Sequence, residues 1–402
     1  MKRDIFCPKT KKERKKKMLD HQRIMAEIDL DNIGHNMREI KKRVGDTKVL
    51  AVVKADAYGH GAVETAKVCL YNGADWLGVA MCDEGAKIRE NNIHVPILIL
   101  GYTPEAQIEE VIRYGLTQAV FSYETAVKIS EAAKKINMTA LVHIKIDTGM
   151  GRIGFFANDE SIEEIMKISC LPNIKITGMF THFATADEKD KTFTREQYEK
   201  FMFMKNELEK RGMNDIICHC ANSGAIIDMP ELNVDMVRAG IIIYGMYPSE
   251  DVRKDILELK PAMSLKTHIS YIKEVEEGTS IGYGRTFFTK RKSRIATIPV
   301  GYADGYSRLM SNRGRVLING KYADVVGNVC MDQIMADITD IDGVNVNDEV
   351  VLMGKMGDNE ISAEELAQLQ GTINYEIVCN VGKRIPRVYI RNGEILRMIS
   401  NL

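Results

Sequence analysis

Residues 49–62, VLAVVKADAYGHGA, contain a β-rich apolar run that ends at a single lysine. The run has the composition of a fully buried strand, and turn residues follow it at once. A lysine is costly in a core strand unless its amine reaches solvent or a partner. Lys54 therefore either marks the point where the strand meets solvent or supplies an amine to a functional site.

The pattern of this stretch recurs along the chain. Seven further apolar runs follow: WLGVAM, PILILGY, TQAVFS, TALVHIKID, IKITGMFTHF, IICHCAN and MVRAGIIIYG. Helix-like segments lie between most of them, at 104–114, 123–136, 158–168 and 192–211. Nearly continuous apolar strands that alternate with helices favour a parallel sheet, and eight such units predict a (β/α)8 TIM-like barrel. An open doubly wound sheet is the alternative, but no glycine-rich dinucleotide turn follows the first strand.

After about residue 259 the runs become shorter and typical of antiparallel strands. Turn pairs break them at Asn319-Gly320, Asp342-Gly343 and Asn392-Gly393. Asn-Gly between β-rich runs is the strongest short hairpin signal. We therefore predict a barrel over residues 23–258 and a mostly antiparallel β domain over 259–402. One short helix, SAEELAQLQ, interrupts this domain, with Ser362 as its N-cap.

Residues 1–22 form a basic extension that we expect to be disordered. No apolar region follows it, so it is not a secretory signal. A role of Lys11 to Lys17 in binding nucleic acid or a membrane is the alternative to a solvated tail. Translation from Met18 or Met25 would remove most or all of the extension.

The composition of the whole chain excludes several classes of protein. A net charge of −1 gives no general attraction to nucleic acid or an anionic membrane. No apolar run approaches the ~20 residues of a membrane helix. The eight cysteines show no metal-ligand spacing, as expected of free thiols in a reducing compartment. We expect a cytoplasmic protein that binds no metal, nucleic acid or membrane.

In a (β/α)8 barrel, functional side chains gather at the carboxyl ends of the strands. Lys54 ends the first predicted strand, Lys145 lies near the end of the fifth, and His182 near the end of the sixth. Ser223 follows the seventh strand and Arg238 lies within the eighth. Because these polar residues would share one mouth, the functional explanation of Lys54 becomes the stronger one.

A lysine amine at such a mouth can hold a carbonyl cofactor such as pyridoxal phosphate (PLP) covalently. This cofactor also needs a phosphate cradle, a partner for its ring nitrogen and acid/base groups. Ser223 and the backbone of Gly240-Ile241 are candidates for the cradle, and Arg238 is the candidate for the ring nitrogen. Candidate acid/base groups include Tyr58, Tyr283 and Tyr375. Each signal is weak by itself, since most tyrosines only pack.

Together, the ordered motifs of the chain resemble those of the alanine racemase family from about residue 23 to the end. They are AEIDLDNIGHN, VVKADAYGHGA, HIKIDTGMGRIG, THFATADE, HCANSGA, VRAGIIIYG, GYGRTF, VGYADGY, NVCMDQIM and NYEIVCNVGKRIPR. The resemblance implies a homodimeric PLP enzyme built from a barrel and a β domain. It further implies two-base interconversion of L-alanine and D-alanine, which supplies D-alanine for peptidoglycan.

The resemblance also implies a role for each matching residue. Lys54 holds PLP and is one catalytic base, Tyr283 is the opposite base, and Lys145 is the position carbamylated in many members. Cofactor contacts are implied for Tyr58, His182, His219, Ser223, Arg238, Gly240, Ile241 and Tyr375. Substrate contacts are implied for Arg152, Met331 and Asp332, and entrance positions for Tyr302, Asp187 and Ile373. Tyr283, Met331 and Asp332 would come from the second subunit.

Two electrostatic expectations follow from these assignments. An arginine at the ring nitrogen leaves that nitrogen unprotonated, which weakens the electron sink and favours reprotonation over transamination. A tyrosine has an ordinary pKa near 10 and needs help as a base. A positive cluster of Arg238, His182 and His219 would lower the pKa of Tyr283.

One position departs from the family pattern, and two other functions stay open. Asn328 stands where many members carry arginine near the entrance. A racemase for another small amino acid, serine above all, is the main alternative, because apolar pockets reject an added hydroxyl only weakly. A PLP-binding protein without activity is the other. The GYGRTF motif argues against it, because barrel-only PLP carriers lack the β domain, and together with Arg238 it argues against a decarboxylase.

Overall fold

A computed structural model describes residues 22–400 of the chain. These residues form two compact units. One comprises residues 32–260, and the other comprises the residues from 261 onward together with the first strand of the chain. Each unit is described by itself below.

The first unit is the predicted (β/α)8 barrel, which the structure confirms. Its eight barrel strands are β2 (Lys48–Val52), β3 (Trp76–Val79), β4 (Ile97–Ile99), β5 (Thr117–Val120), β6 (Ala140–Asp147), β8 (Ile174–Phe180), β9 (Ile217–His219) and β10 (Met236–Ala239). They pair in parallel in the order β10-β2-β3-β4-β5-β6-β8-β9. Most of their side chains are buried, which explains the continuous apolar runs in the sequence.

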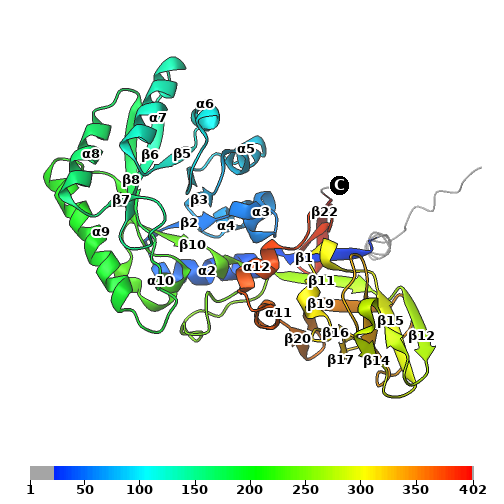
Figure 1. Cartoon of the computed structure of the whole chain (residues 1–402). Coiled ribbons are helices and arrows are strands. Elements are labelled where there is room, and N and C mark those ends of the chain that lie inside the picture. Colours follow the sequence, from blue (N-terminus) through cyan, green and yellow to red (C-terminus); the bar gives the residue numbers. More distant parts are fainter. Residues whose placement is uncertain (1–21, 401–402) are drawn as a thin grey trace, which may run out of the picture. The chain divides into compact units, whose positions relative to one another are not determined.

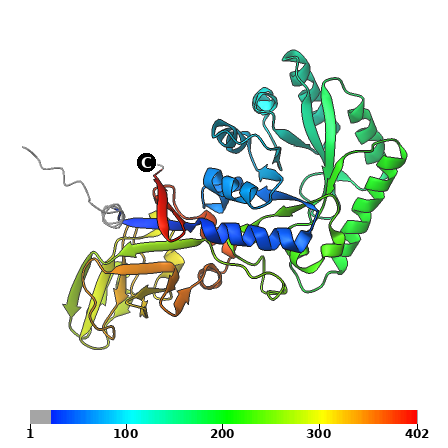
Figure 2. The ribbon, with the colours of Figure 1, turned by 180° about the vertical axis from the view of Figure 1, so that it is seen from behind.

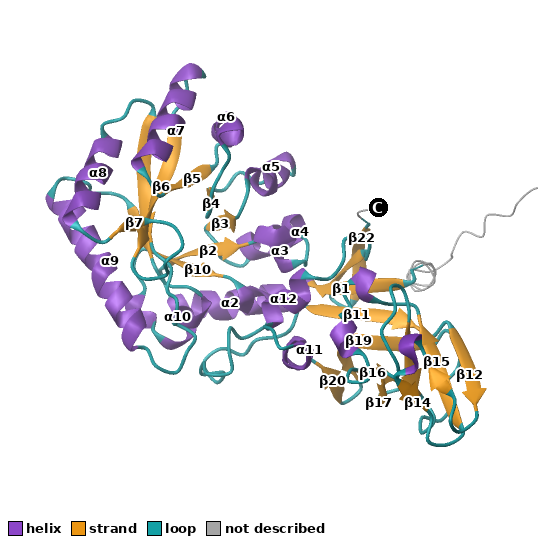
Figure 3. Ribbon diagram, viewed as in Figure 1, coloured by secondary structure: helices purple, strands orange, loops and turns teal. Residues whose placement is uncertain are grey.

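Helices cover the outside of this barrel (Figures 1 and 3). They are α4 (Ala62–Tyr71), α5 (Cys82–Glu90), α6 (Ile108–Arg113), α7 (Tyr123–Lys135), α8 (Asp159–Ser169) and α9 (Thr192–Lys210). The four helical segments expected from the sequence correspond to α6, α7, α8 and α9. Two of these helices begin at side-chain caps, since Ser122 and Asn158 accept hydrogen bonds from the backbone N–H of Thr125 and Ser161.

The barrel closes where β9 and β10, the two ends of the strand order, approach each other. The N–H of Asp235 donates to the carbonyl of Cys218 at 3.1 Å, and the N–H of Arg238 donates to the carbonyl of Ala221 at 2.9 Å. The Asp235 carboxylate also accepts the Cys218 N–H at 2.8 Å. The seam is therefore short and depends on few hydrogen bonds.

The last apolar run of the barrel is only partly a strand. MVRAGIIIYG was expected to be extended throughout, but β10 ends at Ala239 and Ile241–Tyr244 forms a 3-10 helix, η3. Gly240 separates the two with φ −116° and ψ −108°, outside the extended region. The apolar character persists because all four residues of η3 are buried.

The second unit is a mostly antiparallel β structure, as expected. Its main sheet has the order β17-β16-β19-β11-β1-β21-β22, with β20 paired to β19. These strands are β1 (Ile24–Asp29), β11 (Met263–His268), β16 (Arg315–Ile318), β17 (Lys321–Asp324), β19 (Glu349–Met356), β20 (Asn359–Ile361), β21 (Arg387–Arg391) and β22 (Glu394–Ile399). A smaller sheet contains β12 (Tyr271–Val275), β15 (Ser293–Ile298) and β18 (Ile334–Asp337), and β13 (Ser280–Ile281) pairs with β14 (Phe287–Phe288).

The Asn-Gly pairs form the expected hairpins. Asn319-Gly320 joins β16 to β17 and Asn392-Gly393 joins β21 to β22, with positive φ at both residues of each pair. Asp342-Gly343 lies instead between β18 and β19, which do not pair. The predicted helix is α11 (Ala363–Gln370), and the Ser362 hydroxyl accepts the Glu365 N–H at 3.1 Å.

The N-terminal domain boundary differs from the one expected at residue 23. Strand β1 pairs with β11 and with β21, so the first described strand belongs to the β unit (Figure 2). Helix α2 (Leu30–Val44) follows it directly. The first 21 residues lie outside the described part of the chain, so the expectation of disorder there stays a prediction. Between residues 22 and 400, no helix is long and apolar enough to span a bilayer.

Candidate active site

Lys54 stands at the entrance to a left-handed turn, α3 (Lys54–Tyr58). Residues 55–58, none of them glycine, have φ between 50° and 57°. A left-handed helical conformation costs about 1–2 kcal/mol per non-glycine residue, so four in succession are unusual. Such strain persists only where surrounding contacts enforce it, and it is typical of functional sites.

The far end of this turn brings Tyr58 to residues from two other strand ends. A Cβ added to Gly240 would stand 3.1 Å from the Tyr58 hydroxyl and 3.4 Å from Oγ of Ser223. The Ser223 hydroxyl also accepts the Gly240 N–H at 3.0 Å. Ser223 begins helix α10 (Ser223–Asp228), and Ile241 begins η3. Two hydroxyls thus converge where the chain has no side chain, an arrangement that fits a phosphate group.

Arg238, on β10, is the buried cation at the centre of the barrel mouth. Its side chain is 4% exposed and donates to the carbonyls of Thr181, His219 and Cys220 at 2.7, 3.0 and 2.9 Å. Burial lowers the pKa of Arg238 to about 10, so the guanidinium stays charged at neutral pH. A guanidinium can only donate, so a ring nitrogen that faced it would have to accept.

Two histidines flank this guanidinium and are uncharged. Nδ1 of His219 lies 3.1 Å from Nη1, and Nδ1 of His182 lies 3.2 Å from Nη2. Burial, and then the charge of Arg238, hold the pKa of both imidazoles well below the ordinary value. The expected positive cluster is therefore wrong for the histidines, and Arg238 alone carries the charge in this trio. Nη1 has two hydrogens for the carbonyl and the Nδ1 of His219, so Nδ1 of His219 accepts and the proton of this ring sits on Nε2.

His143 extends this arrangement and was missed from the sequence. Its Nδ1 lies 3.0 Å from Nε2 of His219, which places it next in a line from Arg238. Burial lowers the pKa of His143 to about 3, so it is also neutral. The ring packs over Gly178, where an added Cβ would lie 2.4–2.6 Å from its atoms. The sequence did contain a signal for His143: it lies two residues before Lys145 on β6, so both side chains point to the same face of the strand.

Lys145 is almost fully buried near the same guanidinium. Its side chain is 2% exposed, and Nζ donates to the carbonyl of Ile146 at 2.7 Å. Burial, and then the positive charge of Arg238, lower the pKa of Lys145 to about 7, although Asp147 opposes the shift. A much larger share of this amine is therefore neutral at neutral pH than of an exposed lysine, and a neutral amine is a nucleophile.

Arg152 lies in an exposed loop that Asp147 organises. The carboxylate of Asp147 accepts the N–H groups of Gly149, Gly151 and Arg152 at 3.0, 3.1 and 3.2 Å. Although burial opposes ionisation, these hydrogen bonds and the charge of Lys145 lower the pKa of Asp147. The loop thus starts directly at the strand end that carries Lys145.

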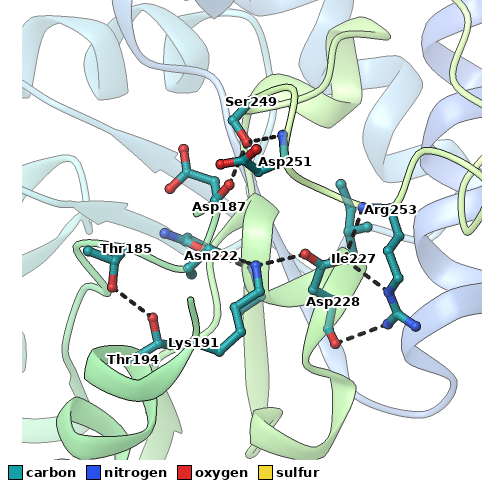
Figure 4. A network of polar contacts seen from close by, with 12 residues as sticks. Thr185, Asp187, Lys191, Thr194, Asn222, Ile227, Asp228, Ser249, Asp251 and Arg253 are labelled. Atoms are coloured by element: carbon teal, nitrogen blue, oxygen red, sulfur yellow. Dashed lines mark hydrogen bonds and ion pairs between the residues drawn. The ribbon is translucent and has the colours of Figure 1, made fainter. Parts of the chain in front are cut away.

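The loop that carries His182 and Asp187 is fastened to α10 by an ion-pair network (Figure 4). Lys191 pairs with Asp228 at 2.8 Å, and Arg253 donates to the other oxygen of Asp228 from its backbone N (3.2 Å) and Nε (3.3 Å). A Cβ on Gly224 would lie 2.8 Å from the backbone of Ala186 and Asp187. Close backbone packing beside Ser223 therefore fixes the position of Asp187.

The β unit carries the second set of implied residues. Tyr283, in the 3-10 helix η4 (Tyr283–Arg285), is 73% exposed, and glycines with positive φ stand on both sides of it. The amide of Asn328 donates to the Tyr283 carbonyl at 2.7 Å. The residue that departs from the family pattern therefore supports the backbone of Tyr283.

Tyr302, Met331 and Asp332 are brought together in this unit. Tyr302 begins the 3-10 helix η5 (Tyr302–Asp304), whose N–H groups at Tyr302 and Ala303 donate to the carbonyls of Cys330 and Met331 at 3.1 Å each. Arg384 donates from Nε to the buried Asp304 at 2.8 Å and from Nη2 to Asp332 at 2.5 Å. Met331 itself is 54% exposed.

Ile373 and Tyr375 lie at the start of α12 (Asn374–Cys379) in the same unit. Ile373 is 59% exposed and is the residue before the helix. The Asn374 amide donates to Glu364 at 2.8 Å, which ties α12 to α11. The structure thus groups the barrel residues around Lys54 and Arg238, and the β-unit residues around Tyr283, Tyr302 and α12.

Known proteins match both units. Residues 28–248 match the family model "Alanine racemase, N-terminal domain", and residues 262–389 match "Alanine racemase, C-terminal domain". An alanine racemase of Clostridium tetani is 52% identical over 381 residues, which are 94% of this chain and 98% of the relative.

Solved structures agree with these matches. An alanine racemase of Clostridium difficile 630 superimposes with a TM-score of 0.91 at 48% identity, covering 95% of this chain and 99% of that one. The alanine racemase of Bartonella henselae, solved with covalently bound pyridoxal phosphate, has a TM-score of 0.81 at 29% identity and covers 92% and 100%. Because these matches span both units, this chain belongs to the alanine racemase family.

Proposed function

We propose that this protein interconverts L-alanine and D-alanine with pyridoxal phosphate held by Lys54. The reaction would take place in the cytoplasm and would supply D-alanine for peptidoglycan. The observation that carries the proposal is the left-handed turn. It starts at Lys54 and ends with the Tyr58 hydroxyl beside Ser223 and Gly240. An amine and a phosphate cradle at the two ends of one short turn suit a cofactor with an aldehyde and a phosphate.

Each residue of the candidate site would have a distinct role in this reaction. Bound PLP would withdraw electrons from Cα of alanine and make its hydrogen acidic. Lys54 would remove or return that proton on one face, and Tyr283 would do so on the other. Arg152 would bind the substrate carboxylate, and Tyr58 and Ser223 would bind the phosphate. Arg238 would donate to the ring nitrogen and leave it without a proton.

We further propose a homodimer in which Tyr283, Met331 and Asp332 serve the site of the second subunit. The exposure of two of these side chains supports this. Tyr283 and Met331 are large side chains that are mostly exposed on their own unit, at 73% and 54%. Isolated exposed hydrophobic residues need no explanation, but several that match one family site favour a binding surface.

The direct test is conversion of L-alanine and attachment of the cofactor. Purified protein with PLP should produce D-alanine from L-alanine. Borohydride reduction and peptide mapping should then find the pyridoxyl group on Lys54. Lys54→Arg keeps the charge but should abolish both results. Conversion by Lys54→Arg at the unmodified rate, or a pyridoxyl group on another lysine, would contradict the proposal.

The two bases should be separable by face. Tyr283→Phe removes only a hydroxyl, and a general base is typically worth ~10²–10⁴-fold. We expect the variant to lose deuterium exchange at Cα of L-alanine far more than at Cα of D-alanine. The measurement is exchange in D2O followed by NMR, with Tyr271→Phe, an exposed tyrosine of the same unit, as control. Equal losses for the two enantiomers would mean that Tyr283 is not a face-specific base.

Shared sites predict complementation between inactive variants. Lys54→Ala and Tyr283→Phe each lack one base, but a mixed dimer contains one site with both. Mixing the two proteins under conditions of demonstrated subunit exchange should therefore restore part of the racemase activity. The control is the Lys54→Ala protein alone, treated under the same exchange conditions. No recovery despite exchange would show that each site is built within one subunit.

The buried amine of Lys145 is suited to carbamylation. A neutral lysine attacks CO2 to form an N–C bond and releases one proton, and a pKa of about 7 leaves much of this amine neutral. With ¹³C-bicarbonate, the protein should show a carbamate NMR signal that grows as pH rises through 7 and is absent from Lys145→Met. Lys128→Met, at an exposed lysine, should keep it. A signal that Lys145→Met retains would exclude this site.

A further inference from the structure

The left-handed turn after Lys54 is held from outside by one carboxylate. Oε1 of Glu84 accepts the N–H of Ala55 at 2.6 Å, and Oε2 of Glu84 accepts the N–H of Ala80 at 2.7 Å. Ala55 follows Lys54 at the exit of β2, and Ala80 follows the last residue of β3. Both contacts are short, as expected for charge-assisted hydrogen bonds. Glu84 therefore bridges the exits of two neighbouring barrel strands.

The two contacts of Glu84 have different meanings. Ala80 lies one residue before the N-cap Met81 of α5, the helix that carries Glu84, so this contact is local to the start of that helix. Ala55 is 29 residues away in sequence and has no such local reason to be bound. Its N–H shares a planar peptide unit with the carbonyl of Lys54. Fixing that N–H therefore fixes the peptide plane through which Lys54 enters the turn.

Two further contacts of the turn are an exposed ion pair and backbone hydrogen bonds of short sequence separation. Lys87, also on α5, pairs with Asp56 at 3.2 Å, but their side chains are 54% and 37% exposed. Exposed pairs of this kind contribute little. The backbone bonds from Ala57 N to Val53 O and from Gly59 N to Ala55 O close the turn on itself. Glu84 thus gives Ala55 a short, charge-assisted contact with a neighbouring strand-helix repeat of the barrel.

We propose that Glu84 is a positioning residue for Lys54: its carboxylate holds the strained turn at Ala55 and so fixes where the Lys54 amine stands. The proposal rests on the proposed function, in which that amine carries pyridoxal phosphate. Glu84 would touch neither cofactor nor substrate and would act only through the backbone of Ala55. Removing its charge should therefore weaken the covalent hold on the cofactor more than it weakens the fold.

The test compares cofactor retention in the holoenzyme. Glu84→Gln leaves one acceptor oxygen and turns the other acceptor into an NH2 donor, which cannot bind a backbone N–H. After dialysis against graded concentrations of PLP, borohydride trapping at Lys54 should show an apparent PLP affinity about tenfold weaker than in the unmodified protein. Asp83→Asn makes the same chemical change at the neighbouring exposed carboxylate and should leave the affinity unchanged.

A second variant tests whether the turn itself is the link. Ala55 is exposed with φ 52°, so Ala55→Gly removes little contact and lets that residue adopt the left-handed region without strain. Ala55→Gly should restore part of the affinity lost in Glu84→Gln. If Glu84→Gln does not yield folded protein, Glu84→Asp, whose side chain is too short to span both N–H groups, replaces it in the comparison.

Three results would overturn the proposal: unchanged PLP affinity in Glu84→Gln, an equal loss in Asp83→Asn, or no rescue by Ala55→Gly. A loss that matches a fall in the urea midpoint of unfolding would likewise show a purely structural role. Absence of the pyridoxyl group from Lys54 in the unmodified protein would instead refute the proposed function, so the two failures are distinguishable.

Discussion

The guanidinium of Arg238 is the interaction on which the barrel mouth depends. Its side chain donates to carbonyls at the ends of β8 and β9, and its backbone N–H donates to the carbonyl of Ala221, so one residue joins three strand ends at the seam. A buried charge is tolerated only when its donors are satisfied, and here carbonyl dipoles satisfy them. Burial, and then this positive charge, lower the pKa of His182, His219 and Lys145. The same residue therefore helps to close the barrel and sets the charge of the site.

Much of this fold was predictable because its signals are local. Buried parallel strands need continuous apolar runs, and tight hairpins need residues that accept positive φ, so both appear directly in the sequence. The Ser362 cap is local as well. The exceptions are nonlocal. The strand at Ile24–Asp29 would fit either unit by composition, and only its pairing with β11 and β21 assigns it to the β unit.

The residues of the candidate site were predictable where ordered motifs contain them. The protonation states of those residues were not, because burial determines them. The sequence contains the histidines beside Arg238, but their neutrality follows from desolvation, which a sequence does not display. His143 had a weak signal in its alternation with Lys145. Glu84 had no signal in the sequence, because a glutamate in the first turn of a helix is common. Its contact with Ala55 joins residues that are 29 positions apart in the chain.

The residue types of the left-handed turn also explain why the turn needs a contact such as that of Glu84 with Ala55. Glycine would adopt φ near 50° without strain, yet the chain uses alanine, aspartate, alanine and tyrosine at residues 55–58. For residues with a Cβ, the right-handed and extended regions are lower in energy than the left-handed region. The turn therefore keeps its conformation only while contacts from outside it, such as that of the Glu84 carboxylate with the Ala55 N–H, offset the strain. Loss of such a contact would let the turn relax and would move the Lys54 backbone, and under the proposed function that backbone carries a base that must serve one face of a planar substrate.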